Sequence, residues 1–357
     1  MTYDVVVAGG SFAGLVLATS IRGRVALVEK GQVGDGQTSA CATTLDLIHK
    51  LGLEASIEEI HEHAVMHTRT GTVRFRLPYR FASFDYRRFC ELLMERFDGE
   101  LVNEAALGVE DGAVVTATRR VEGRVLVDAT GWRATLASSV QPGFPVATMR
   151  SYGLEKPALG FGGSGLHFYF DPGIRGDGYG WAFPAGGVAR SGVLSYVAAA
   201  GVRASTEDFL AAEGMHGGHY HGGYLPAGLR PALAGEVFLV GDAAGHCLPL
   251  TGEGIRPAVF FAQQLSELLN AVISGDLELD SARGAYSTLQ RRYERRYRWL
   301  RQAQALLNGW PDPPIGLFFQ AFSKGVLYRW LCGVYWEVAA PILPAARPNP
   351  ARLEATA

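Results

Sequence analysis

Residues 5–14 of this chain read VVVAGGSFAG, and this stretch decides the fold. Its first four residues are an apolar run of the kind that forms a buried parallel strand. Residues 12–21 then predict a helix of small and apolar residues, and residues 24–29 predict a second apolar strand that ends in an acid. Strand, helix and strand follow one another within about thirty residues, which is the length of one βαβ unit.

The turn between the first strand and the helix is built from small residues. Gly9 allows the tight turn, Gly14 permits close packing of the helix on the strand, and Ser11 is small enough to admit a pyrophosphate at the helix N-terminus. Glu29 ends the second strand, where a carboxylate can accept both ribose hydroxyls of an adenosine. We therefore predict a dinucleotide site. The residues assigned to it are Gly9, Ser11, Phe12, Ala13, Gly14, Glu29, Lys30 and Arg87.

A second strand, turn and helix indicate that the dinucleotide is FAD rather than NAD. Residues 237–240 are an apolar strand, and Gly241 and Asp242 follow it in a turn of small residues. An acid at this place can bind the ribityl chain of FAD. Residues 249–255 then open a helix whose backbone N–H groups and dipole can hold the flavin ring. The residues assigned to FAD here are Gly241, Asp242, Gly252, Gly254 and Ile255.

The composition argues against several other classes of protein. Hydrophobic residues are 48% and charged residues 19%, which excludes intrinsic disorder. A net charge of -2 gives no electrostatic case for binding nucleic acid. The four cysteines form no CxxC pair, so we expect neither a disulfide framework nor a metal site. Because an apolar strand begins directly after Asp4 and no apolar run reaches about 18 residues, we expect no signal peptide, no membrane span and a cytoplasmic location.

Changes of pattern along the chain predict an α/β domain combined with an antiparallel β domain. A Rossmann-like FAD-binding domain is interrupted by an antiparallel-sheet substrate domain and followed by a C-terminal helical segment. The FAD-binding domain comprises residues 1–75, 76–139 and 232–280, the substrate domain residues 140–231, and the C-terminal helices residues 281–357. Three short strands over residues 101–127, broken at Gly108, Asp111-Gly112 and Glu122-Gly123, predict a β-meander.

Three segments together resemble the FAD-dependent glutathione-reductase-like superfamily that contains the aromatic hydroxylases. They are residues 9–14 with Glu29, residues 128–131 (Asp-Ala-Thr-Gly), and Gly241-Asp242 with residues 252–254. Within this superfamily, YGWAFP at residues 179–184 resembles the YxWxFP signature of geranylgeranyl reductases, which saturate isoprenoid double bonds. The resemblance implies that Tyr179, Trp181 and Phe183 line the substrate cavity. It also implies that Cys41 lies beside the flavin, although the glycines around this cysteine in the family are alanines here.

The resemblance implies a reductase of polyprenyl lipids or prenyl diphosphates, with Cys41, Tyr179 and Trp181 as the candidate catalytic residues. Its electron donor would be NADPH or a ferredoxin-type protein. A monooxygenase that hydroxylates a small aromatic or apolar substrate is the alternative. A flavin-binding protein without turnover is a third and weaker hypothesis. Halogenase chemistry is disfavoured, because none of the four lysines lies where a halogenase needs one.

Two further patterns concern surfaces. The Arg-rich helix predicted for residues 281–308 fits a solvated face or, as the less favoured alternative, contact with anionic lipid or a pyrophosphate headgroup. An aromatic tail could extend the substrate tunnel and dip into a membrane, so peripheral membrane contact is a further hypothesis. The tail comprises Phe318, Phe319, Phe322, Tyr328, Trp330, Tyr335 and Trp336. His216, His219 and His221 lie in a glycine-rich loop with no acid or cysteine nearby in the sequence, so we expect them to be solvated.

Overall fold

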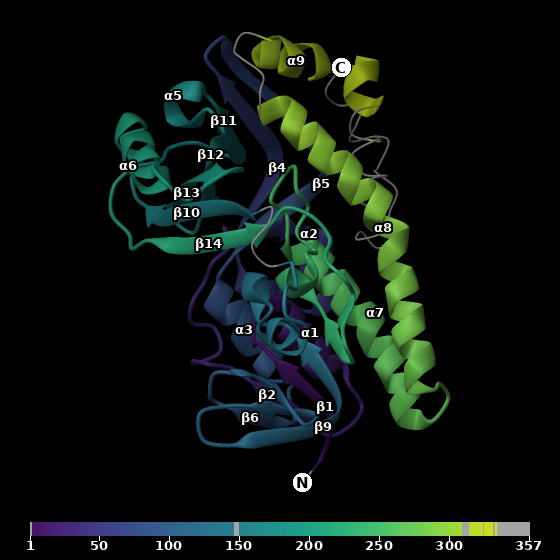
Figure 1. The fold of residues 1–357 in the computed structure, drawn as a ribbon. Coiled ribbons are helices and arrows are strands. Elements are labelled where there is room, and N and C mark those ends of the chain that lie inside the picture. The colour runs from purple at the N-terminus through teal and green to yellow at the C-terminus, as the bar shows by residue number, and fades with distance from the viewer. Residues whose placement is uncertain (1, 146–149, 309–313, 324, 331–332, 334–357) are drawn as a thin grey trace. The chain divides into compact units, whose positions relative to one another are not determined.

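The computed structural model describes residues 2–145, 150–308, 314–323, 325–330 and 333 (Figure 1). The chain forms two compact units. Unit 1 consists of Met1–Asp35, Arg87–Met149 and Leu225–Trp299. Unit 2 consists of Gly36–Tyr86, Arg150–Tyr224 and Leu300–Ala357. Tyr335 and Trp336 of the predicted aromatic tail lie outside the described residues.

Unit 1 is built on a mainly parallel sheet. In order across the sheet its strands are β15 (Leu233–Ala234), β16 (Val237–Leu239), β9 (Arg120–Asp128), β1 (Tyr3–Ala8), β2 (Val25–Val28) and β6 (Glu100–Val102). Strands β16, β9, β1, β2 and β6 run parallel to one another. Residues 5–8 of β1 are fully buried, because helices cover a parallel sheet on both faces. The carboxyl ends of β1, β9 and β16 therefore meet at one edge.

The helices of unit 1 follow from the same sequence signals. They are α1 (Phe12–Ser20), α3 (Tyr86–Met94), η2 (Gly131–Arg133), α4 (Thr135–Val140), η3 (Gly241–Ala244), α7 (Ile255–Ser274) and the first part of α8 (Leu279–Asn308). Helix α1 packs against α7. Phe260 and Phe261 of α7 contact Tyr293 of α8 through edge-to-face rings, so the long helix α8 lies beside α7 (Figure 1).

The predicted meander needs one correction. Strands β7 (Gly108–Glu110) and β8 (Ala113–Val115) form a hairpin with the predicted turn at Asp111-Gly112, and β8 pairs with β9. The predicted break at Glu122-Gly123 is wrong, because both residues lie inside β9. Gly123 pairs with Tyr3, and a Cβ atom there would lie 2.6 Å from Cγ2 of Val6. This glycine serves close approach between two strands rather than a turn.

Unit 2 is built on a mixed sheet. In order its strands are β14 (His221–Pro226), β10 (Arg150–Ala158), β13 (Val188–Ser195), β12 (Gly178–Ala185), β11 (Leu166–Phe170), β4 (Ile57–Thr68), β5 (Gly71–Phe84) and β3 (Ala42–Thr44). The pairs β10–β13, β13–β12, β12–β11 and β4–β5 are antiparallel, whereas β11 and β4 are parallel. Its helices are α2 (Leu45–Leu51), η1 (Glu54–Ser56), α5 (Pro172–Arg175), α6 (Val202–Ala212) and α9 (Pro314–Phe322).

The unit boundaries differ from those read from the sequence. Residues 36–86, assigned above to the FAD-binding domain, belong to unit 2, because β4 joins its sheet through β11 and β5 pairs with β4. Residues 225–231, assigned above to the substrate domain, belong to unit 1. Strands β4 and β11 lie about a hundred positions apart in the chain, and a pairing at that distance leaves no local periodicity in the sequence. Residues 281–299 belong to unit 1 rather than to a separate helical segment. No helix among the described residues is both long and apolar enough to cross a membrane.

Candidate functional site

The turn after β1 is held at backbone contact with its neighbours. Gly9 has a φ of +109°, and a Cβ atom there would lie 2.2 Å from the carbonyl oxygen of Ala129. At Gly14, in the first turn of α1, a Cβ atom would lie 1.8 Å from the carbonyl oxygen of Gly9. Only glycine fits at these two places, so strand, helix and the end of β9 pack together without side chains between them. The steric roles predicted for Gly9 and Gly14 match this geometry.

Glu29 lies next to that turn. Its Oε2 accepts a hydrogen bond of 2.6 Å from the backbone N–H of Gly10. Asn103 fixes the chain behind it by donating to the carbonyl oxygens of Glu29, at 3.2 Å, and Gly31, at 2.8 Å. The half-buried carboxylate therefore stands at the rim of the helix N-terminus, where an adenosine ribose would lie in a dinucleotide site.

Lys30 and Arg87 occupy the outer edge of unit 1. Both side chains are exposed. Arg87 forms an ion pair of 2.5 Å with Asp35. The structure thus places them near the surface, and their part in cofactor binding stays a prediction.

The structure brings the second predicted turn to the first. Ser11, Ala13 and Gly14 follow β1, Gly241 and Asp242 follow β16, and these parallel strands end at the same edge of the sheet. A Cβ atom at Gly241 would lie 2.9 Å from Cβ of Ala13. A Cβ atom at Gly254, the residue before α7, would lie 3.8 Å from Oδ1 of Asp242. Residues from segments far apart in the sequence therefore form one cluster in unit 1.

Residues 128–131 support this cluster from the middle strand. Asp128 is fully buried and accepts hydrogen bonds from the backbone N–H groups of Thr130 and Ala137, both at 2.9 Å, and from the hydroxyl of Thr130 at 2.7 Å. Burial raises the pKa of Asp128, and the hydrogen bonds oppose this shift. The side chain thus shapes the turn that carries the Ala129 carbonyl under Gly9.

Asp242 is the acid that this cluster presents. Burial raises the pKa of its carboxyl to about 6, against the opposing effect of the Arg230 guanidinium. Arg230 donates to the carbonyl oxygens of Asp242, at 3.1 Å, and Trp132, at 2.7 Å. Asp242 as a residue is not fully buried, so its carboxylate can accept hydrogen bonds from a bound hydroxyl group.

His246 supports this turn through hydrogen bonds, and no pattern in the sequence indicated that role. Its Nδ1 accepts a hydrogen bond of 3.1 Å from the N–H of Gly241, and its Nε2 lies 3.1 Å from Oε1 of Gln290 on α8. The ring stacks on Phe261 and is fully buried, which lowers its pKa to about 3 and keeps it neutral. Tyr297 of α8 donates to the carbonyl oxygen of His246. The spacing of tyrosines along α8 marks a buried face, but nothing in it identifies the turn that this face supports.

The predicted aromatic residues of unit 2 share one face of its sheet. Tyr179, Trp181 and Phe183 alternate along β12 and are all buried. The ring of Phe168 on β11 lies 6.0 Å from Tyr179 and 5.2 Å from Phe183, centroid to centroid. Ala182 points to the opposite face, where it packs with residues of α6. We call the face that carries the three residues of β12 the aromatic face.

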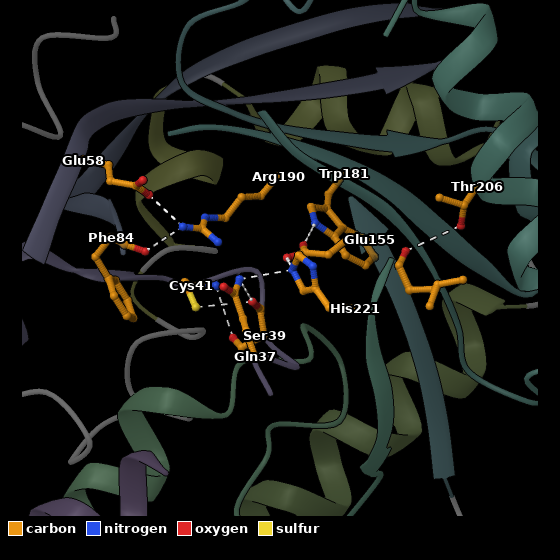
Figure 2. A network of polar contacts seen from close by, with 11 residues as sticks. Gln37, Ser39, Cys41, Glu58, Phe84, Glu155, Trp181, Arg190, Thr206 and His221 are labelled. Atoms are coloured by element: carbon orange, nitrogen blue, oxygen red, sulfur yellow. Dashed lines mark hydrogen bonds and ion pairs between the residues drawn. The ribbon is translucent and has the colours of Figure 1, made fainter. Parts of the chain in front are cut away.

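One row across the aromatic face ends in a buried acid. Trp181 on β12 and Glu155 on β10 both pair with Gly192 of β13, which lies between them. A Cβ atom at Gly192 would lie 2.6 Å from Cβ of Glu155 and 2.7 Å from Cζ2 of Trp181. The glycine therefore leaves room for the indole to reach across the strand, and Nε1 of Trp181 donates to Oε2 of Glu155 at 2.9 Å (Figure 2).

His221 is not the solvated residue that its loop suggested. It begins β14, beside β10, and its Nε2 contacts Oε1 of Glu155 (Figure 2). Nε2 of Gln37 lies 3.1 Å from the same ring nitrogen. The expectation was wrong for His221 because its partner lies 66 positions earlier in the chain. His216 and His219 are exposed, as expected.

Cys41 lies in a strained loop of the same unit. It is fully buried and has a φ of +50°, a left-handed conformation that costs about 1–3 kcal/mol for a residue with a side chain. Its Sγ lies 3.3 Å from the carbonyl oxygen of Ser39, and its carbonyl accepts from the N–H of Phe84 at 3.0 Å. The structure thus holds the thiol in a fixed place.

Arg190 is the charged group near this thiol. It forms an ion pair of 2.8 Å with Glu58 and donates to the carbonyl oxygen of Phe84 at 3.1 Å. Burial lowers the pKa of Arg190, but the charges of Cys41 and Glu58 outweigh it and raise the pKa overall. Figure 2 shows both side chains in one polar network.

Comparisons with known proteins identify the fold. No model of a protein family matches the chain, and neither does any curated protein. Among solved structures, a geranylgeranyl bacteriochlorophyll reductase-like protein from Thermoplasma acidophilum is 18% identical, with a TM-score of 0.82 over 96% of this chain and 97% of that one. The p-nitrophenol 4-monooxygenase PnpA from Pseudomonas putida is 16% identical, with a TM-score of 0.73 over 94% and 98%. The flavin-dependent brominase Bmp2 is 15% identical, with a TM-score of 0.70 over 99% and 98%.

This chain has the fold of the flavin-dependent reductases and monooxygenases. The predicted fold class, a Rossmann-like domain interrupted by a second sheet domain and followed by helices, is confirmed. In this flavoenzyme fold the second sheet is mixed rather than purely antiparallel, because β4 enters it parallel to β11.

Proposed function

We propose that this chain is a FAD-dependent reductase that saturates carbon–carbon double bonds of a polyprenyl lipid or a prenyl diphosphate. The observation that carries the proposal is the aromatic face, on which Tyr179, Trp181 and Phe183 lie in one row along β12. The likeness to a reductase-like protein over nearly the full length of both chains supports it.

The residues of unit 1 fit FAD. The backbone contact at Gly9 and Gly14 leaves the first turn of α1 without side chains that would block a pyrophosphate. Glu29 would bind the ribose of the adenosine, and the partly exposed Asp242 would bind the ribityl hydroxyls. The start of α7, from Gly252 to Ile255, would direct its N–H groups and dipole at the flavin. When bound and reduced, FAD supplies a hydride.

The aromatic face suits a substrate with isolated double bonds. An isolated alkene accepts hydride poorly, so cationic character develops at the carbon that is about to receive the hydride. Faces of aromatic rings stabilise such character, and a dry surface keeps water from trapping it. Tyr179, Trp181 and Phe183 would supply the aromatic ring faces. Because these residues are buried, the surface that they form would also be dry.

Cys41 is our proposed third catalytic residue. A guanidinium close to a thiol is an environment typical of reactive cysteines, and Arg190 provides it here. The strained backbone at Cys41 is also typical of functional positions.

We further propose NADPH or a ferredoxin-type protein as the electron donor, and a cytoplasmic enzyme that touches membranes at its periphery. Exposed apolar side chains such as Leu317 and Trp330 in unit 2, and exposed Arg295, Arg298 and Trp299 on α8, are residue types that bind lipid surfaces.

Anaerobic turnover tests the proposed reaction. The purified protein is loaded with FAD, reduced under nitrogen and mixed with geranylgeranyl diphosphate, and the product is analysed by mass spectrometry. We expect a mass increase of two hydrogens for every bond reduced, together with oxidation of the flavin. Reoxidation by air alone, with oxygen incorporated into a product, would instead identify a monooxygenase.

A variant at Trp181 tests the aromatic face. We expect Trp181→Ala to lower turnover at least about tenfold while FAD stays bound, because the ring lies in unit 2 and the predicted FAD residues lie in unit 1. Val197→Ala is the control in the same unit, since that side chain is 64% exposed. Equal turnover of Trp181→Ala and the wild type would remove Trp181 from the site.

A further inference from the structure

Glu155 is a buried carboxylate with a partner on each oxygen. The N–H of Trp181 donates to Oε2 at 2.9 Å, and the ring of His221 contacts Oε1 through Nε2 (Figure 2). The side chain of Glu155 is 2% exposed and that of His221 is 18% exposed. The acid therefore lies in the interior, and the imidazole continues the network towards the surface of unit 2.

The chemistry of the contact fixes which ring nitrogen carries the proton. An ionised carboxylate only accepts hydrogen bonds, so Nε2 of His221 must be the donor to Glu155. The amide nitrogen of Gln37, which lies 3.1 Å from the same ring nitrogen, donates instead to the carbonyl oxygen of Ser39 at 2.8 Å. Nδ1 has no hydrogen-bond partner among the residues that the structure describes. Glu155 thus orients the ring and leaves Nδ1 as the atom that can take up and release a proton, which is the arrangement of a general acid with its orienting carboxylate.

The pair lies on the aromatic face. Glu155 pairs with Gly192, and Gly192 pairs with Trp181, so acid and indole belong to one row of the sheet. Trp181 donates to Oε2 of Glu155, the carboxylate oxygen that His221 does not contact, and so helps to fix the carboxylate. A substrate on the aromatic face would therefore lie on the same face as a proton donor whose position is set by three strands.

Few other charged groups face this pair. Arg190 lies on the same face, and its pKa is raised in part by the charge of Glu155. Glu58 pairs with Arg190 and offsets that charge. Lys156 is adjacent to Glu155 in β10 and so points to the opposite face, where it pairs with Glu207.

We infer that His221 is the proton donor of the reduction, with Glu155 and Trp181 as its positioning residues. The inference rests on the proposed function. One alkene carbon would gain the hydride that bound, reduced FAD supplies, and the electron pair of the π bond would take the Nδ1 proton of protonated His221 onto the other carbon. The alkene would thereby be reduced at the expense of the flavin, and His221 would become neutral. Solvent would return a proton to the ring, and a nicotinamide or ferredoxin donor would supply the electrons for the next turnover.

His221→Gln tests the inference in the FAD-loaded protein, with His219→Gln as the matched control. His219 lies two positions away, is exposed and is outside the network. We expect His221→Gln to keep its FAD content and its rate of flavin reduction, and to lose about 100-fold or more in kcat for alkene reduction. In the wild type, kcat plotted against pH should decline at alkaline pH with the loss of one proton, because the proton donor must be protonated. This decline should be absent from His221→Gln.

A second readout does not depend on turnover or FAD. The fluorescence of Trp181, taken as the difference between the wild type and Trp181→Phe, should follow a one-proton pH titration, since Glu155 links the indole to the imidazole. We expect that titration to disappear in His221→Gln and to persist in His219→Gln. An unchanged titration in His221→Gln would overturn the inference.

The outcomes separate the inference from the function. If the wild type reduces the alkene and His221→Gln has the same kcat and the same decline at alkaline pH, His221 is not the proton donor. The proposed reductase function is unaffected by that result. A wild type that reduces no alkene overturns the proposed function together with this step. Loss of kcat in both His221→Gln and His219→Gln would also contradict the assignment, because it would point to the loop and not to the ring.

Discussion

Asp242 is an acid that the fold keeps in a place unfavourable for its charge. Its raised pKa of about 6 means that the ionised carboxylate is less stable in the folded protein than in the unfolded chain. Such a cost is typical of a residue that serves binding rather than stability. The carboxylate is retained next to Gly254, and the preceding Gly241 lies against Ala13, where both predicted FAD turns meet.

Replacing this charge should stabilise the protein without cofactor. At pH 8 the free energy of unfolding of cofactor-free Asp242→Asn should exceed that of the wild type by about 1–2 kcal/mol. The sign follows from linkage: a folded-state pKa above the unfolded value means that the folded wild type gains stability as the pH falls below about 6. The difference should therefore shrink between pH 6 and pH 4. Urea unfolding at several pH values measures it, with exposed Asp276→Asn as the control. A less stable Asp242→Asn at pH 8 would contradict the account.

In strand β13, the absence of a side chain at Gly192 allows a contact between residues of the two neighbouring strands. Gly192 lets Trp181 of β12 reach Glu155 of β10 across it, so three strands contribute to one polar contact. The tryptophan could be predicted from its motif. The acid and His221 could not, because their role depends on sheet register between distant segments.

Gly192→Ala should displace the indole. Its Cβ atom would lie 2.3 Å from the carbonyl oxygen of Leu154 and 2.7 Å from Trp181, so a neighbour must move. We expect lower stability, by about 1–3 kcal/mol, and an altered emission of Trp181. Gly180→Ala on β12 is the control, because a Cβ atom there would meet its nearest atom at 3.5 Å. If the two variants behaved alike, the steric role of Gly192 would be refuted.

At the scale of the whole molecule, the features that could be predicted best are those encoded by residues close together in the sequence. The βαβ start, the turn after β16 and the shared face of Tyr179, Trp181 and Phe183 all rest on short periods and close spacing. The placement of residues 36–86 could not be read in this way, since β4 meets its partner β11 only through the tertiary fold. Likewise, the support that His246 and Gln290 give the cofactor turn depends on where α8 docks.

The central claim is that the turn after β1 and the turn after β16 together bind one FAD molecule. Titration of cofactor-free protein with FAD, followed by the quenching of flavin fluorescence, tests it most directly. We predict that the wild type binds one FAD per chain and that Asp242→Ala, folded as judged by circular dichroism, binds it at least about tenfold more weakly. A wild type that takes up no FAD, or an Asp242→Ala variant that binds it equally well, would contradict the account.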